Sequence, residues 1–290
     1  MSNILLTIDV EDWFQVENFK PWIAYSTWSS RELRVEKKTH QLLDLLDSLK
    51  SVHPGNKLPK ATFFILGWIA EHIPDLVKEI HNRGHEVASH GYSHKRCDRQ
   101  PLLELKADLQ ASKKILEDII SARVYGYRAP NFSINNKVLQ VIEECGYKYD
   151  SSYNSFGLHG RYGHLTLPQS NGKSIAVNIT KDFHEIPVSN LKIGKTIIPL
   201  GGGGYFRLMP FMLFKYGVKK ILQKDNAYIF YMHPWEIDPE QPRVDEAYPT
   251  YKFRHYINLN KTAARLSALI KSFKRCSFVT CNEYINLIRE

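Results

Sequence analysis

The chain has 290 residues, with 39 Lys and Arg against 30 Asp and Glu and a net charge of +9. Hydrophobic residues make up 43% of the chain and charged residues 24%, which is typical of a globular protein and excludes a disordered, collagen-like or coiled-coil chain. No window of about eighteen residues is apolar throughout, so we expect no transmembrane span.

Short apolar runs alternate with helical patterns through the first half of the chain. The predicted strands cover residues 4–8, 61–66, 85–89, 124–127 and 147–149. The predicted helices cover residues 33–49, 74–83, 101–120 and 135–145. Gly84 and Gly146 follow two of these helices as C-caps. Alternation of this kind predicts an α/β fold whose parallel sheet has right-handed crossovers.

Residues 151–205 are rich in Ser, Asn, Gly and His, and we interpret them as a long insertion with its own hairpins. They contain short strand patterns at 175–177 and 185–188, and we expect the closing run Gly201–Gly204 to be a flexible turn. The alternation then resumes with helices and strands at 208–222, 227–232, 261–274, 277–280 and 282–289, around a loop at 233–259. The sequence has no repeat or linker, so we expect one domain over 1–290, completed by residues 236–290.

Polar side chains with catalytic potential follow four of the predicted strands. They are Asp9, with Glu11 and Asp12 just beyond it, His90, with His94 four residues on, Arg128 and His233. The carboxyl ends of the strands of a parallel α/β barrel form one rim, and active sites lie there. We therefore expect these side chains to converge.

The spacing of His90 and His94 suits a metal ion if the segment between them makes a helical turn, and a carboxylate from another strand would complete the ligand set. Residues 9–12 supply three carboxylates, which repel one another unless a cation lies among them. Alone, the histidines could be surface loop residues and the acids a helix N-terminus. Their coincidence at strand ends favours a site for a divalent metal.

Five segments carry these residues in the order of the motifs of the polysaccharide deacetylase family with the NodB homology domain (carbohydrate esterase family 4), which the chain resembles. The segments are Thr7-Ile8-Asp9, Ser89-His90-Gly91-Tyr92-Ser93-His94, Tyr127-Arg128-Ala129-Pro130, Tyr149-Asp150-Ser151-Ser152 and Met232-His233-Pro234. Residues 9–14, 233–239 and 253–256 are similar to the subgroup associated with bacterial exopolysaccharide export loci. The resemblance implies a distorted (β/α) barrel with a long insertion. It also implies a metal-dependent hydrolase that removes N-acetyl groups from an amino-sugar polysaccharide or lipid-linked oligosaccharide.

The resemblance implies a role for each strand-end residue. Asp9 matches the general base, Arg128 the arginine that orients the base, and His233 the general acid. His90 and His94 match the two metal histidines.

The first motif departs from the family pattern, because Val10 follows Asp9 where the family usually has a second aspartate. The third ligand is therefore either Glu11 or Asp12, and both stay candidates. We expect zinc as the metal, with other divalent ions open.

Residues beside the motifs are candidates for contact with the substrate. They are Trp13, Pro130, Asn131, Asp150, Tyr153 and Trp235, with Phe156 and Tyr205 as further rings that could stack on sugars. For each aromatic residue, packing in the core is the alternative. Three other functions compete with deacetylation. They are a small-molecule amidohydrolase of the same fold acting on a cyclic amide or ureide, a glycan-binding protein without activity, and a glycosidase using Asp12 and Glu236 as its carboxylate pair.

The N-terminus has no basic region, and its apolar run is too short for a secretory signal, so we expect a cytoplasmic protein with an N-acetylated glycan as its partner. The four scattered cysteines are expected to be reduced. Residues 205–290 hold 14 Lys and Arg against 8 Asp and Glu. This excess indicates a solvated basic surface or one that favours anionic glycans or lipid headgroups, and no signature of nucleic-acid binding accompanies it. Peripheral membrane association and homo-oligomerisation stay open.

Overall fold

The computed structural model describes residues 2–52, 57–157, 162–168 and 174–289. Its main sheet runs in the order β10-β1-β2-β3-β4-β5-β7-β6, and β11 also pairs with β1. Among the described residues the pairings in this sheet are parallel, except that between β6 and β7. Its strands are β1 (Asn3–Val10), β2 (Ala61–Ile65), β3 (Glu86–Ser89), β4 (Gly126–Tyr127), β5 (Tyr149–Asp150), β6 (Val177–Asn178), β7 (His184–Glu185), β10 (Ala227–Met232) and β11 (Ser277–Phe278).

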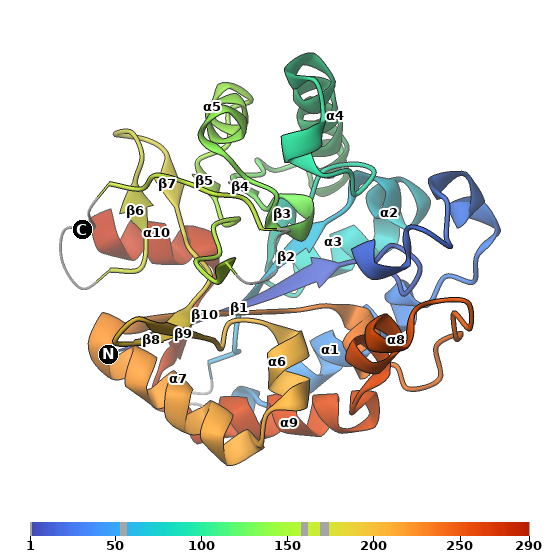
Figure 1. Ribbon diagram of the computed structural model, residues 1–290. Coiled ribbons are helices and arrows are strands. Elements are labelled where there is room, and N and C mark those ends of the chain that lie inside the picture. Colours follow the sequence, from blue (N-terminus) through green and yellow to red (C-terminus); the bar gives the residue numbers. More distant parts are fainter. Residues whose placement is uncertain (1, 53–56, 158–161, 169–173, 290) are drawn as a thin grey trace.

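Helices surround the sheet (Figure 1). They are α1 (Val35–Ser48), α2 (Gly67–His72), α3 (Pro74–Asn82), α4 (Leu102–Ile120), α5 (Asn136–Glu144), α6 (Gly203–Leu208), α7 (Phe211–Asp225), α8 (Pro249–Tyr256), α9 (Leu259–Ser272) and α10 (Cys281–Arg289). Short 3-10 turns at Pro130–Phe132 (η6) and Pro234–Ile237 (η8) follow β4 and β10. Within the described ranges, no helix combines the length and the apolar character that crossing a membrane requires.

The main sheet is curled and mostly parallel, and helices lie outside it. This arrangement confirms the predicted distorted (β/α) barrel. β1 and β2 are buried almost throughout, because helices cover one side and the interior of the curl covers the other. Their sequences are accordingly nearly continuous apolar runs rather than alternating ones.

The segment between β7 and β10 spans the gap that the curled sheet leaves open. The hydroxyl of Ser189 accepts a hydrogen bond from the backbone N–H of Ile229 at 3.0 Å, and Gly202 pairs in parallel with Tyr231. Between these two contacts the segment forms a separate hairpin of β8 (Asn190–Ile193) and β9 (Thr196–Pro199). The predicted insertion therefore holds two hairpins, β6–β7 and β8–β9, although residues 158–161 and 169–173 lie outside the described part.

Two predictions about the second half need correction. The helix expected at 208–222 is α7, which begins three residues later because Pro210 holds Met209 in an extended conformation, and the helix before it, α6, was not predicted. The loop expected at 233–259 contains η8 and α8, each of which begins with a proline.

The glycine run is not the flexible turn that we expected. Gly203 lies against η8, and a Cβ there would be 2.2 Å from a carboxylate oxygen of Glu236. At Gly202 a Cβ would be 2.5 Å from the hydroxyl of Tyr231. Glycine is needed at these two positions because the backbone packs directly against side chains of β10 and η8.

Helix α9 packs on the barrel through the apolar side predicted from its spacing. Leu266, Leu269 and Ile270 are buried, and Ala263 and Phe273 are partly buried against the same core. The helix therefore contributes to the single large core that also contains β1 and β10.

We expect Ile270→Ala to lower the free energy of unfolding by about 2–5 kcal/mol, because it deletes a fully buried side chain and leaves a cavity. Urea denaturation measures this change. The matched control is Leu103→Ala, on α4, where the side chain is 81% exposed and the change should stay within about 0.5 kcal/mol. An unchanged midpoint for Ile270→Ala would show that α9 is not part of the cooperative core.

Candidate active site

The register of the sheet brings the predicted strand-end residues to one edge. Ile8 pairs with Met232, Val10 with Ile65, and Ile65 in turn with Ser89. β1 extends two residues beyond its predicted end, so it carries Asp9 within the strand. Because these strands are parallel and end together, the residues that follow them meet there, as predicted.

Arg128 holds Asp9 in a buried ion pair. One guanidinium nitrogen, Nη1, donates to Asp9 Oδ1 and to Thr7 Oγ1, both at 2.7 Å. The other two nitrogens donate to the backbone oxygen and the hydroxyl of Ser151 at 2.9 Å. The guanidinium carbon also lies 4.1 Å from the centre of the Phe64 ring. Arg128 is fully buried, so these contacts fix its position and that of Asp9.

Glu11, His90 and His94 form a buried cluster beside this pair. Glu11 Oε1 lies 3.0 Å from His90 Nε2 and 2.9 Å from His94 Nε2. The three ligand atoms lie within 4.8 Å of one another. Burial by itself raises the pKa of Glu11, but the charges of His94 and His233 outweigh it and hold that pKa well below its usual range.

The segment that joins the two histidines is a loop rather than the helical turn that we assumed. Gly91 and His94 both have left-handed backbone angles, with φ of +74° and +54°. These two reversals turn the imidazole of His94 back towards that of His90, with ring centres 5.5 Å apart. The two rings therefore come together through reversals of a loop and not through a helical turn.

Asp12 does not join the cluster. Its carboxylate accepts hydrogen bonds from the backbone N–H groups of Trp13, Arg34 and Val35 at 2.7–2.8 Å, at the start of α1. Burial nevertheless raises the pKa of Asp12 to about 6. Of the two candidate acids, Glu11 lies with the histidines and Asp12 has a capping role, because adjacent residues after a strand point in opposite directions.

His233 faces Glu11 across the edge of the sheet. Its Nε2 lies 3.8 Å from Glu11 Oε1, while its Nδ1 donates to Glu236 Oε1 at 2.9 Å. Burial disfavours the charged imidazole, but the negative charges of Glu11 and Glu236 outweigh burial and raise the pKa of His233 to about 9. His233 is therefore protonated at neutral pH in this arrangement.

A second buried arginine, Arg207, holds Glu236 in place. Its Nε donates to Glu236 Oε2 at 2.7 Å. Its other nitrogens donate to the backbone oxygens of Arg254, His255 and Ile257, at the end of α8. Sequence reasoning missed this residue, because nothing near Arg207 in the sequence marks it as different from a surface arginine.

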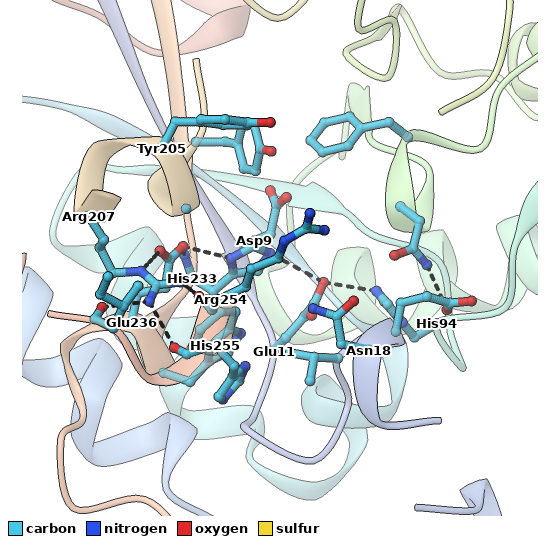
Figure 2. Close-up of a pocket in the computed structure, with 18 of the residues that line it drawn as sticks. Asp9, Glu11, Asn18, His94, Tyr205, Arg207, His233, Glu236, Arg254 and His255 are labelled. Atoms are coloured by element: carbon cyan, nitrogen blue, oxygen red, sulfur yellow. Dashed lines mark hydrogen bonds and ion pairs between the residues drawn. The ribbon is translucent and has the colours of Figure 1, made fainter. Parts of the chain in front are cut away.

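A cavity opens over these groups (Figure 2). Of the predicted substrate residues, Asn131, Trp235 and Tyr205 line it. It is also lined by residues that we did not predict: Glu17, Asn18, Phe132, Tyr162, Arg207, Leu208, Tyr231, Arg254, His255 and Ile257. Of these residues, only Arg254 and His255 lie in a segment that the sequence analysis had singled out, residues 253–256.

Five predicted substrate residues lie outside the cavity lining. Trp13 is buried, with its indole N–H bonded to the backbone oxygen of Glu32, and Asp150 is buried with its carboxylate on Ser152. Tyr153 packs against the core, Pro130 is buried in η6, and Phe156 is buried with its ring centre 5.7 Å from that of Tyr205. For Trp13 and Tyr153 the packing alternative holds.

Comparison with known proteins divides the chain into two matched regions. Residues 29–149 match the family model described as polysaccharide deacetylase, and residues 151–286 match a domain of unknown function, DUF3473. The chain is 31% identical over 110 residues to a peptidoglycan-N-acetylglucosamine deacetylase of Bacillus cereus, covering 38% of this chain and 47% of that protein. It is 32% identical over 108 residues to a peptidoglycan deacetylase of Helicobacter pylori, covering 37% of this chain and 35% of that protein. The chain thus spans less than half the length of either relative.

Solved structures share the fold along nearly the whole chain. The Xyl-CE4 domain of a multidomain xylanase from the hindgut metagenome of Trinervitermes trinervoides has a TM-score of 0.54 at 14% identity, covering 99% of this chain and 91% of that one. The peptidoglycan deacetylase PdaC from Bacillus subtilis has a TM-score of 0.52 at 15% identity, covering 99% and 92%. The five ordered motifs, the family match and this shared fold agree: residues 29–149 are similar to the polysaccharide deacetylase family, and the chain as a whole shares the fold of solved structures of the carbohydrate esterase family 4 type.

Proposed function

We propose that this protein is a metal-dependent deacetylase that removes N-acetyl groups from an amino-sugar polysaccharide or a lipid-linked oligosaccharide. The observation that carries the proposal is the meeting, at one cavity, of the Glu11–His90–His94 cluster, the Asp9–Arg128 pair and a protonated His233. The deacetylase relatives support an N-acetylated glycan as the substrate class. The continuous pairing of β10 and β11 with β1 supports residues 1–290 acting as one domain.

The cluster fits a divalent metal. His90 Nδ1 lies 2.7 Å from the backbone oxygen of Arg128, which only accepts, so Nδ1 carries the proton and a neutral His90 has its lone pair on Nε2. That lone pair then faces a carboxylate oxygen of Glu11, and two acceptors at 3.0 Å need a cation between them. Glu11, His90 and His94 would hold the ion, and two nitrogens with one oxygen suit zinc. When bound, the metal lowers the pKa of water and polarises the amide carbonyl.

Asp9 is placed to act as the general base. Its Oδ1 is held by Arg128, and we assign proton transfer from the attacking water to Oδ2. The ionised carboxylate is the form that accepts a proton.

His233 is placed to act as the general acid. Glu236 fixes the proton on Nδ1, so Nε2 points into the cavity and donates its proton to the departing amine. The raised pKa keeps that proton available at neutral pH. A glycosidase mechanism with Asp12 and Glu236 is not supported, because both carboxylates are engaged in buried structural contacts.

Metal binding distinguishes Glu11 from Asp12. We expect His90→Ala, His94→Ala and Glu11→Ala to lose bound metal, measured by elemental analysis after dialysis, because each removes one ligand atom. Asp12→Asn is the matched control, since it keeps the shape of the helix cap and should retain the metal. Loss of metal in Asp12→Asn with retention in Glu11→Ala would reverse the assignment.

Substrates with different leaving groups separate the acid from the base. We expect His233→Ala to lower acetate release from an N-acetylglucosamine oligomer by roughly a hundredfold or more, because an amine leaves poorly without a proton. An activated aryl acetate needs no such proton and should lose much less. Asp9→Asn should slow both reactions, since both need an activated water. Equal losses for the two substrates in His233→Ala would contradict the acid role.

The charge of Glu236 should control the proton affinity of His233. We expect Glu236→Gln to lower the pKa of His233 below its value of about 9, measured by NMR titration of the metal-free protein, because the imidazolium loses a negative partner. Glu240→Gln, an exposed neighbour in the sequence, is the control and should leave the titration unchanged. An unaltered pKa in Glu236→Gln would show that Glu236 positions the ring without tuning it.

A further inference from the structure

Helix α7 presents an apolar surface to solvent. On this side Met212 and Leu213 are each 65% exposed and Tyr216 is 59% exposed, and Lys219 and Lys220 continue the same side one turn further on. The opposite side is buried in the barrel through Phe214, Gly217, Val218, Ile221 and Leu222. Packing of the core therefore does not explain why α7 carries three large apolar side chains on its exposed side. We call residues 212, 213, 216, 219 and 220 the α7 face.

The surroundings of the α7 face are strongly basic. From residue 186 to residue 224 the chain has six lysines besides the buried Arg207 and no Asp or Glu, and Asp225 is the first acid after it. The Lys220 ammonium lies 5.4 Å from the centre of the Tyr216 ring, so charge and apolar surface are interleaved. An apolar strip bordered by lysines on a surface helix is typical of a segment that lies in the interface of an anionic membrane.

The β8–β9 hairpin lies against the other side of α7. It packs on α7 where Gly217 lies beside the side chains of Leu191 and Leu200. At its turn Ile193 is 58% exposed, with Lys192 and Lys195 on either side, also exposed. The hairpin thus repeats, on a second element, the combination of an exposed apolar side chain and flanking lysines.

We propose that the α7 face docks on the surface of an anionic phospholipid bilayer. Two other occupants fit less well. A second copy of the chain would bring the same lysines against one another, because a two-fold interface is self-complementary, and lysine is depleted in the cores of protein interfaces. An anionic polysaccharide would satisfy the lysines but leave Met212 and Leu213 in water.

Docking of this kind would place the cavity near the headgroups. α7 ends at Asp225 and β10 begins at Ala227, so the helix runs antiparallel to the strand and starts at the edge where the cavity lies (Figure 1). Leu208, at the end of α6, lines the cavity and is 49% exposed, and in the sequence it comes just before the α7 face. This consequence, unlike docking itself, rests on the proposed function: it favours a glycan still attached to a lipid over a free polymer.

Sedimentation with lipid vesicles tests docking directly. We expect the protein to sediment with vesicles that contain phosphatidylglycerol, to sediment far less with phosphatidylcholine alone, and to be released by high salt. Lys219→Glu with Lys220→Glu, and separately Met212→Ser with Leu213→Ser, should each weaken binding by at least about tenfold. Matched controls are Lys37→Glu with Lys137→Glu, and Leu103→Ser, which change exposed residues on α1, α5 and α4 and should bind as the unmodified protein does.

The proposal would be overturned if the protein did not bind phosphatidylglycerol vesicles, or if both double variants bound them as tightly as the unmodified protein does. A dimer in sedimentation velocity that Met212→Ser with Leu213→Ser converts to monomer would also overturn it, because the face would then bind a second copy. Acetate release from a soluble N-acetylglucosamine oligomer should be unchanged in the α7 variants, which lie outside the cavity lining. If the unmodified protein released no acetate, the proposed function would fail, while vesicle binding would still decide docking.

Discussion

The buried guanidinium of Arg128 is the contact on which the rest of the candidate site depends. Its side chain joins the strand that carries Asp9 to the backbone beyond β5, and it lies over a ring of β2. Its backbone oxygen accepts the Nδ1 proton of His90 and so sets the tautomer of that ring. One residue therefore orients both the carboxylate of Asp9 and an imidazole of the cluster. Removing one partner of such a buried pair costs about 3–5 kcal/mol because the other charge stays buried without a partner, so the sheet tolerates loss of neither residue well.

The second half of the chain completes this arrangement from the other side of β1. The region that matches the domain of unknown function supplies His233, Glu236 and Arg207. It also supplies the backbone of Gly203, which packs against Glu236 so closely that a side chain would not fit. The region that matches the polysaccharide deacetylase model contains both histidines of the cluster and Arg128, but no counterpart of His233. Asp9 and Glu11 precede both regions, so the full set of groups at the cavity exists only when β1 pairs with β2 of one region and β10 of the other.

The sequence was sufficient to predict most strands of the main sheet, their parallel direction and the residues at their ends, because apolar runs that stop at polar residues are local signals. It did not decide between Glu11 and Asp12, since the choice depends on where the chain points one residue after β1. The substrate residues were predicted least well. Trp13 and Asp150 adjoin the motifs in sequence but turn inward, whereas Glu17 and Tyr162 reach the cavity from segments without a motif. Arg207 and Gly203 were missed or misread because their partners are distant in sequence.

Arg207 has a thermodynamic consequence that extends beyond the site. The same guanidinium holds Glu236, which raises the proton affinity of His233, and the backbone oxygens at the end of α8. Local unfolding of α8 would release those oxygens and loosen the hold on Glu236, so it would favour loss of the proton from His233. By linkage, deprotonation of His233 must in turn make α8 easier to unfold. The protonation of His233 and the local stability of α8 are thus thermodynamically coupled.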